Sequence, residues 1–406
     1  MSIEGPFEWL AGGLFFGKQQ KGGIESIDSC GDAVVLLKGI AQSLQEILAQ
    51  TENNEAPEEP ANLLAARLRR LRFLLYDERR VPKETSSRWG NHAPTMVENT
   101  LQGLLGPEMN DLIPTLLEHL VVLPFESRKD VAAIFNYLLV SGFDGTDAEI
   151  YRRHMIRFRD HVEQHFPRVI SAILAGHDPA VHGQKDVCLH YGSMYRACLR
   201  HPALYHRMVG TTESVRSYVF PFLDIFVHLP NFEVASDAME SLREVMTAGQ
   251  GSSSSRDPQI QQELAEIAAT FLARDYDEIW NRRFNTNLLS ESANYMTRRV
   301  ALQILSTVLL TRSNYSIMIE FVASKTNLIL IMKLLRDTSP HITLDAFHVF
   351  KVFVANPNKP PEVVQILRDN QVKLVNYLTS LHQEKEETDT QFRDEKALII
   401  ATIQAL

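Results

Sequence analysis

Cysteine is scarce in this sequence of 406 residues, which contains only Cys30, Cys188 and Cys198. An odd, sparse set of cysteines does not support a disulfide framework and favours a reducing compartment. The N-terminus lacks the basic-then-apolar order of a secretory leader, so we expect none. The longest apolar runs are about ten residues, too short to cross a bilayer. We therefore expect a cytoplasmic protein that has no membrane partner.

Motifs for catalysis are also missing. The sequence contains no GxxxxGK[ST], HExxH or GxSxG pattern. Cys188, His190, Cys198 and His201 are spaced as CxH…CxxH, which differs from the usual zinc knuckle, so buried helix residues are the favoured interpretation. A formal net charge of −9 argues against a nucleic-acid partner. We expect no catalytic residue, no cofactor and no metal, although an enzyme assembled from scattered residues stays an alternative.

The most informative stretch present is Ser339–Asn358, SPHITLDAFHVFKVFVANPN. Ser339 followed by proline predicts a helix start in which the hydroxyl accepts a free backbone N–H. Asp345, His348 and Lys351 recur at every third position and predict one narrow polar stripe. A helix that is apolar on its other sides must be covered by neighbours. The stripe residues His348 and Lys351 are then candidates for contact with a partner.

A pattern of this kind recurs along the chain: a small residue leads apolar residues at roughly three, four and seven positions later. The leading residues are Ala132, Gly192, Ala238, Ala301 and Ala346, separated by 60, 46, 63 and 45 residues. Steps near 45 match armadillo or HEAT repeats of about 40–47 residues. The longer steps contain loop-like insertions at 141–147 and 249–258. The sequence therefore predicts an all-α helical-repeat solenoid in which stacked units share a continuous core.

The expected organisation has two parts. Residues 1–60 form a divergent N-terminal region with a Gly-rich arm, a helix over 32–50 and a polar linker, and residues 61–406 form the repeat domain with a flexible insertion near 249–258. The acidic stretch Glu384–Glu387 is predicted to be a solvated loop before a last helix over Phe392–Leu406.

Two basic positions are candidates for binding. Arg298 and Arg299 are predicted at the start of a helix over Met296–Leu310, and Arg312 and Tyr315 lie three residues apart just after it. Exposed Arg and Tyr are frequent anchors at interfaces. The alternative is structural, because arginine suits a helix C-terminus and a tyrosine at a turn can simply pack.

Several blocks together resemble one known family. They read FESRKDV at 125–131, RACLRHP at 196–202, FEVASDA at 232–238, NYMTRR at 294–299, SNYSIM at 313–318, LLRD at 334–337, FHVFKVFVANPNK at 347–359 and QFRDEK at 391–396. This set resembles the calcium-binding protein 39 family of armadillo-like kinase scaffolds, whose fungal members include the HymA and Hym-one type. The match is densest from about residue 124 to the C-terminus.

The resemblance implies a horseshoe of about six or seven helical repeats and a non-catalytic function. Members of the family bind a Ste20-type or germinal-centre-type kinase or pseudokinase on the concave face and hold it in an active-like state. Selective binding of one conformation shifts the kinase toward that conformation. The resemblance also implies a protein that is monomeric alone and acts in signalling, cell polarity and morphogenesis.

The resemblance also implies a pocket near the C-terminal repeats that takes a Trp-Glu-Phe-type peptide from the partner's tail. Arg299 matches the family's pocket arginine and Met332 its pocket methionine. Gln303 and Asp369 stand where the family has lysines, so two basic residues of the pocket are lost. A less acidic tail peptide is expected here.

Arg312 and Tyr315 match the arginine and aromatic residue of the family's kinase-binding face. A generic armadillo adaptor unrelated to kinases is the alternative. Such an adaptor would need ladders of Trp and Asn along its concave helices, whereas this chain has only Trp9, Trp89 and Trp280, none in register with the repeats.

Overall fold

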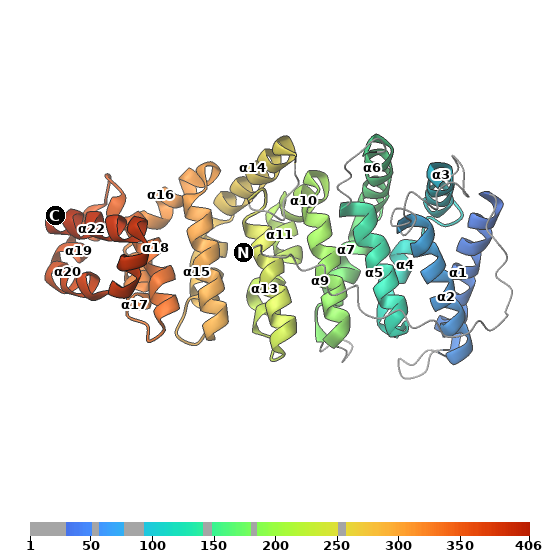
Figure 1. The fold of residues 1–406 in the computed structure, drawn as a ribbon, viewed down its shortest axis with the longest axis horizontal. Helices are drawn as coiled ribbons and strands as arrows, with labels where there is room; N and C mark the ends of the chain where they lie inside the picture. Colours follow the sequence, from blue (N-terminus) through green and yellow to red (C-terminus); the bar gives the residue numbers. More distant parts are fainter. Residues whose placement is uncertain (1–29, 51–56, 77–92, 141–147, 180–184, 251–256) are drawn as a thin grey trace.

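The computed structural model describes residues 30–50, 57–76, 93–140, 148–179, 185–250 and 257–406. Helices build all of these ranges, and no strand occurs in them. They stack side by side along one long axis, from α1 at one end to α22 at the other (Figure 1). The prediction of an all-α helical-repeat solenoid is confirmed. The expected N-terminal arm and the loop at 141–147 lie outside the described residues, as does most of the insertion near 249–258.

The stack begins with the pair α1 (Cys30–Gln50) and α2 (Glu58–Tyr76) and continues in units of three helical segments. The first two units are α3 (Ala93–Leu104), α4 (Leu112–Glu118) with η5 (Leu120–Val122), and α5 (Phe125–Val140), followed by α6 (Ala148–Gln164), α7 (Phe166–Ala175) and α9 (Lys185–Leu199). The next two are α10 (Pro202–Val209) with α11 (Thr212–Tyr218), α12 (Phe220–Asp224) with η6 (Phe226–His228), and α13 (Phe232–Met246), followed by α14 (Pro258–Arg274), η7 (Asp277–Leu288) and α15 (Tyr295–Leu310). The last two are η8 (Arg312–Asn314) with α16 (Tyr315–Ala323), α17 (Lys325–Leu334) and α18 (Pro340–Ala355), followed by α19 (Pro361–Asp369), α20 (Gln371–Ser380), α21 (Gln383–Thr388) and α22 (Thr390–Gln404).

The third helices of successive units pack against one another in a row: α5 on α9, α9 on α13, α13 on α15, α15 on α18 and α18 on α22. The five small residues that mark the sequence repeat lie one on each of the first five. Gly192 shows why a small residue is needed, because a Cβ atom there would lie 1.7 Å from Asp237 Oδ2 of the next helix. The sequence repeat is therefore the repeat of this packed row.

Helix α18 has the bounds that the sequence predicts, and Phe347, Phe350 and Phe353 are fully buried in the shared core. The prediction of a Ser339 cap is wrong in its mechanism. Ser339 is the N-cap residue, but its hydroxyl makes no capping hydrogen bond. The Asp337 carboxylate instead accepts the Ser339 backbone N–H at 2.9 Å.

Two local structures differ from expectation. The stretch Glu384–Glu387 belongs to helix α21, not to a loop. Lys385 stabilises this helix by pairing with Asp389 at 3.2 Å, one turn later. Segment η7 is a wide helix of the i→i+5 type over twelve residues. Its ion pair between Arg283 and Glu278, at 2.6 Å, spans five positions as that winding requires.

Candidate partner-binding surfaces

A polar ladder runs the length of the stack, with one side-chain contact at each of the five junctions of the third-helix row and one at each of the preceding α1–α2 and α2–α5 junctions. Each contact joins residues from neighbouring helices, so the ladder fixes how far one repeat slides against the next. Its members are Arg67–Ser43 (2.6 Å), Arg72–Asp130 (2.6 Å), Asn136–Ser193 (2.9 Å), Arg196–Asp237 (2.7 Å), Arg243–Gln303 (3.5 Å), Arg299–Asp345 (3.6 Å) and Lys351–Glu395 (2.7 Å).

Arg299 and Gln303 lie together on α15 as part of this ladder. The Arg299 Nε atom is 3.6 Å from Asp345 Oδ2 on α18, and Gln303 Nε2 donates to the same oxygen at 3.4 Å. Burial raises the pKa of Asp345, and the Arg299 charge opposes that rise. The positive charge of Arg299 is therefore partly balanced within the protein, and the side chain is half-buried.

No hydrogen bond or ion pair within the described residues joins Arg299 to the other two residues expected at the peptide pocket. Met332 is half-buried on α17 and packs against the hydrophobic core. Asp369 is exposed at the end of α19, where its carboxylate accepts Gln365 Nε2 at 2.6 Å. The peptide pocket therefore stays a prediction.

Arg312 and Tyr315 lie at the start of the next unit, about three helical turns beyond Arg299. Tyr315 is 64% exposed, so the alternative that it packs in the core is wrong. Arg312 is exposed and has no ion-pair or hydrogen-bond partner for its side chain among the described residues. Leu310 and Ile319, 61% and 37% exposed, flank them. We call these four residues the Tyr315 patch.

Lys351 is less available than the sequence suggests. Its ammonium group pairs with Glu395 on α22 at 2.7 Å, so the structure corrects its role from a contact candidate to a ladder residue. His348 is half-buried, and burial lowers its pKa. The three-residue polar stripe on α18 is real, but it mainly faces neighbouring helices.

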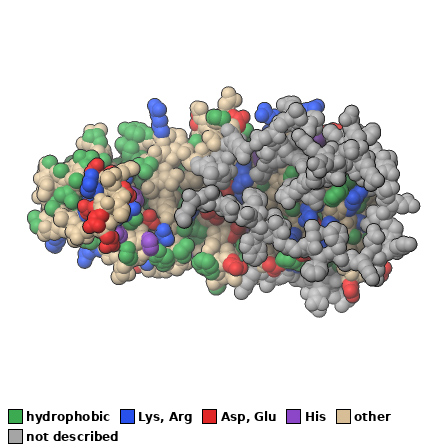
Figure 2. Space-filling model, in the orientation of Figure 1, with side chains coloured by type: hydrophobic (Ala, Val, Ile, Leu, Met, Phe, Trp, Pro, Cys, Tyr) green, Lys and Arg blue, Asp and Glu red, His purple; other side chains and the backbone are tan. Residues whose placement is uncertain are grey.

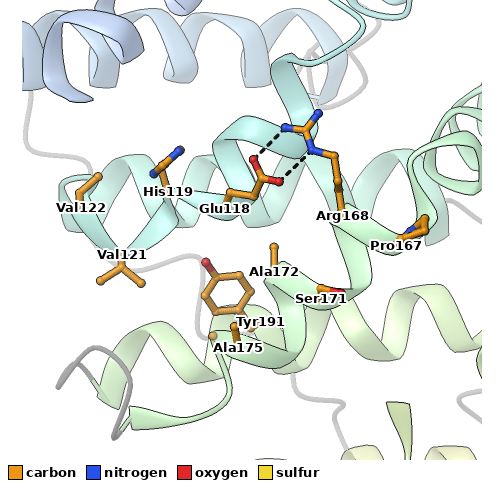
Figure 3. Close-up of a pocket in the computed structure, with 11 residues that line it drawn as sticks. Glu118, His119, Val121, Val122, Pro167, Arg168, Ser171, Ala172, Ala175 and Tyr191 are labelled. Carbon is orange, nitrogen blue, oxygen red and sulfur yellow. Dashed lines mark hydrogen bonds and ion pairs between the residues drawn. The ribbon is translucent and has the colours of Figure 1, made fainter. Parts of the chain in front are cut away.

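A cleft of about 690 Å³ opens between α4 with η5 and α7, over the ring of Tyr191 (Figure 3). Arg168 closes one rim through two hydrogen bonds to Glu118, at 2.8 and 2.9 Å, and one to Asp111 at 2.6 Å. The hydrogen bond from Arg168 lowers the pKa of Glu118. Because each of these charges already has a partner, this cleft offers mainly apolar contact.

A larger cleft of about 1050 Å³ lies between η7, the start of α15 and α17. Three of its lining residues are asparagines, Asn281, Asn285 and Asn327, and two are the exposed cations Lys333 and Arg336. The residues predicted at the peptide pocket do not line it. We call it the Asn285 cleft.

Among the described residues, no three His, Cys, Asp or Glu side chains are placed to hold a metal ion. Cys188 and Cys198 are buried free thiols, and burial raises the pKa of Cys188 to about 12. His201 Nε2 lies 2.6 Å from the Leu139 carbonyl, so it already has a structural partner. None of the described helices combines the length and hydropathy needed to cross a bilayer.

Acidic and basic side chains lie mixed over the C-terminal helices, at the end of the molecule that grey atoms do not cover in Figure 2. The fold and these surfaces define an armadillo-type repeat protein whose exposed features suit contact with other proteins. The sequence matches the Mo25-like family over residues 32–406, and the chain belongs to that family.

Its relatives carry varied names. The chain is 35% identical to the degreening-related gene dee76 protein of Auxenochlorella protothecoides, over 73% of this chain and 79% of the relative. It is 33% identical to calcium-binding protein 39-like of Mus musculus, over 73% and 76%. It is 27% identical to the conidiophore development protein hymA of Emericella nidulans, over 90% of each chain. The resemblance found from the sequence blocks is thereby confirmed.

Sequence reasoning missed the polar ladder and the Asn285 cleft. The ladder does leave a signal, since its partners on adjacent helices are separated by about one repeat, 41 residues for Arg196 and Asp237 and 44 for Lys351 and Glu395. Complementary polar residues one repeat apart could have been sought. The cleft leaves no such signal, because its residues come from three helices with unrelated spacing.

Proposed function

We propose that this protein is a non-catalytic scaffold that binds a Ste20-class or germinal-centre-class kinase, or a pseudokinase, and activates it allosterically. Its role would lie in signalling for cell polarity and morphogenesis. Membership of the Mo25-like family supports a scaffold. The observation that carries the proposal is the Tyr315 patch, in which an exposed aromatic ring lies three positions from a guanidinium that has no partner among the described residues.

The patch is suited to an interface because it combines apolar area with a free charge. Tyr315 and Ile319 lie one turn apart on α16 and therefore share a face. Below them the helix is held rigidly, with Ile317 and Phe321 buried in the core. A rigid aromatic anchor loses little entropy on binding, and an unpaired arginine can meet a carboxylate on the partner.

Activation would follow from differential binding. A scaffold that contacts both lobes of a closed kinase, and only one lobe of an open kinase, stabilises the closed state by the difference in affinity. About 1.4 kcal/mol of difference raises the ratio of closed to open kinase tenfold. No phosphate transfer by the scaffold is needed. In this proposal Arg299 and Met332 would hold a tail peptide of the kinase, with Gln303 and Asp369 reducing the preference for acidic residues.

The alternative, a generic armadillo adaptor, is favoured less. Trp280 is fully buried in η7 and so is not part of an exposed tryptophan ladder. The test is co-purification of the full-length chain from its source cells, followed by identification of bound kinases. A bound germinal-centre-class kinase is expected. Recovery of other partners with no kinase among them would favour the adaptor.

A further inference from the structure

We propose that the Asn285 cleft is a second docking site, which takes an extended segment of a partner protein containing an aliphatic residue followed by acidic residues. This site is separate from the Tyr315 patch and does not depend on the proposed kinase function. It rests on a chain of amide hydrogen bonds, on two facing rows of side chains and on charge.

The amide chain fixes the polarity of the cleft floor. The Phe321 carbonyl can only accept, and Asn327 Nδ2 donates to it at 3.1 Å. Asn327 therefore presents its Oδ1 atom to Asn285, whose Nδ2 donates at 3.0 Å. The Asn285 Oδ1 atom is then left as an acceptor, and it has no hydrogen-bond partner among the described residues. A buried acceptor without a donor is unfavourable, so rotation of the Asn285 amide toward a ligand's backbone N–H would be favoured.

The two walls differ in chemistry and run side by side. Along η7, Asn281 and Asn285 project into the cleft four positions apart, and Leu289 follows them. Each amide nitrogen already makes one hydrogen bond, Asn281 to Asp277 and Asn285 to Asn327, both at 3.0 Å. Each amide keeps a second N–H and its carbonyl oxygen, so the row suits the alternating C=O and N–H groups of an extended chain. Along the opposite wall, Ile329 is 44% exposed and Lys333 follows it one turn later on α17.

The end of the second wall is cationic. Arg298 lines the cleft but is paired with Asp337, so its charge is balanced. Lys333 and Arg336 are exposed, and no ion pair is formed by either within the described residues. The remaining acid of the lining is Glu291. The chain has a net charge of −9, but these two cations make this end of the cleft locally positive. This end of the cleft therefore attracts acidic side chains.

The chemistry of the expected ligand follows from these features, taken in order along the cleft. An aliphatic side chain would contact Ile329 and Leu330, the backbone would bond the asparagines, and one or two acidic side chains would reach Lys333 and Arg336. Both walls are anchored in the core, α17 by Leu328 and Ile331 and η7 by Trp280 and Phe284. A partner of this chemistry needs no rearrangement of the stack.

The test is a selection of random peptides displayed on phage against the full-length protein, followed by affinity measurement with the enriched peptides in labelled, synthetic form. The critical variant is Lys333→Glu with Arg336→Glu. The matched control is Lys373→Glu with Arg393→Glu, which makes the same charge change at exposed positions on α20 and α22. Thermal midpoints of both variants check that they fold.

We expect enriched peptides to be acidic with an aliphatic residue, to bind the critical variant at least about tenfold more weakly, and to bind the control within about twofold. Asn285→Ala is expected to weaken binding as well, through the lost acceptor. Peptides that bind the critical variant and the wild type equally, or a selection that enriches no acidic sequence, would overturn the proposal. Binding lost on Arg312→Ala with Tyr315→Ala would equally contradict it, since the site would then be the Tyr315 patch.

Discussion

Arg196 on α9 donates to Asp237 on α13 at 2.7 Å, and both side chains are about one-sixth exposed, at 15% and 16%. The pair lies directly beside Gly192, whose missing Cβ atom gives Asp237 the space to approach. Arg196 also donates to the Ser241 hydroxyl at 2.8 Å. One arginine therefore connects two repeats through a carboxylate and a hydroxyl, and the glycine is part of the same contact.

Breaking this pair from one side is expected to be costly. Arg196→Met leaves Asp237 without its cation in a poorly solvated place, which should lower the free energy of unfolding by roughly 3 kcal/mol. Chemical denaturation of the purified variant measures this. The double variant Arg196→Met with Asp237→Leu should recover much of the loss, because no unpaired charge remains. If the Arg196→Met variant is as stable as the wild type, the ion pair between Arg196 and Asp237 does not contribute to the free energy of unfolding.

Gly192→Ala is expected to destabilise the α9–α13 junction, since the new methyl group would meet the Asp237 carboxylate. A loss of about 1–3 kcal/mol in the free energy of unfolding is predicted from overpacking. Gly192→Ala combined with Asp237→Ala should lose less than the two single variants added together, because the clash then has no partner. If the losses in unfolding free energy from Gly192→Ala and Asp237→Ala simply add, the proposed contact between position 192 and Asp237 is contradicted.

The core of α18 gives a prediction independent of charge. Phe350 is fully buried, so Phe350→Ala should cost about 3–5 kcal/mol of stability through lost burial and a cavity. The exposed neighbour Ala355, at the end of the same helix, provides a control position. Ala355→Ser should change the unfolding free energy by less than about 0.5 kcal/mol. If Phe350→Ala and Ala355→Ser change the unfolding free energy by similar amounts, α18 does not belong to the shared core.

Buried histidines predict that the protein loses stability in mild acid. Burial lowers the pKa of His177 to about 4, below the ordinary 6.5. Between these values the unfolded chain binds a proton that the folded chain excludes, so stability falls as pH drops from 6.5 toward 4, by up to about 1.4 kcal/mol per pH unit. His161 and His201 have pKa values lowered to about 4 for the same reason and add to the slope.

His177→Phe separates this residue from the others. Its ring is surrounded by Tyr195, Phe222 and Phe226, so an aromatic replacement keeps an apolar contact. The variant should show a shallower loss of unfolding free energy between pH 6.5 and 4 than the wild type, whatever its stability at neutral pH. An unchanged slope would show that His177 does not contribute to it.

Much of the architecture is predictable because it follows from local pattern. The small residues Ala132, Gly192 and Ala346 mark the third helices, since close helix packing repeats at every unit and leaves a periodic trace. The bounds of α18 were predictable from Pro340 and Asn356 for the same reason. Helix α21 was not, because its acidic sequence suggests solvent, whereas Glu386 pairs with the buried Lys396 of the neighbouring helix α22.

The candidate binding sites could be predicted from the sequence only in part. The exposure of Tyr315 could be proposed from its sequence position but not established, since a tyrosine at a turn can equally pack. The contact between Arg299 and Asp345 depends on the register of α15 against α18, which no local pattern specifies. The polarity of Asn285 depends on two other residues and a carbonyl brought together only by the fold.

If the Tyr315 patch is an interface rather than part of the core, removing its side chains should not affect folding. Arg312→Ala with Tyr315→Ala is expected to leave the thermal midpoint nearly unchanged, because both side chains are exposed. Differential scanning fluorimetry measures this directly. A large fall in the midpoint would instead mean that the patch supports the fold.

Under the proposed function, this protein raises the activity of a Ste20-class kinase through the Tyr315 patch. The most direct measurement is the rate of phosphate transfer by the co-purified kinase alone, with the wild-type protein, and with the Arg312→Ala, Tyr315→Ala variant. The account predicts a higher rate with the wild-type protein and a rate near that of the kinase alone with the variant. Equal rates in all three reactions, across the germinal-centre kinases tested, would contradict it.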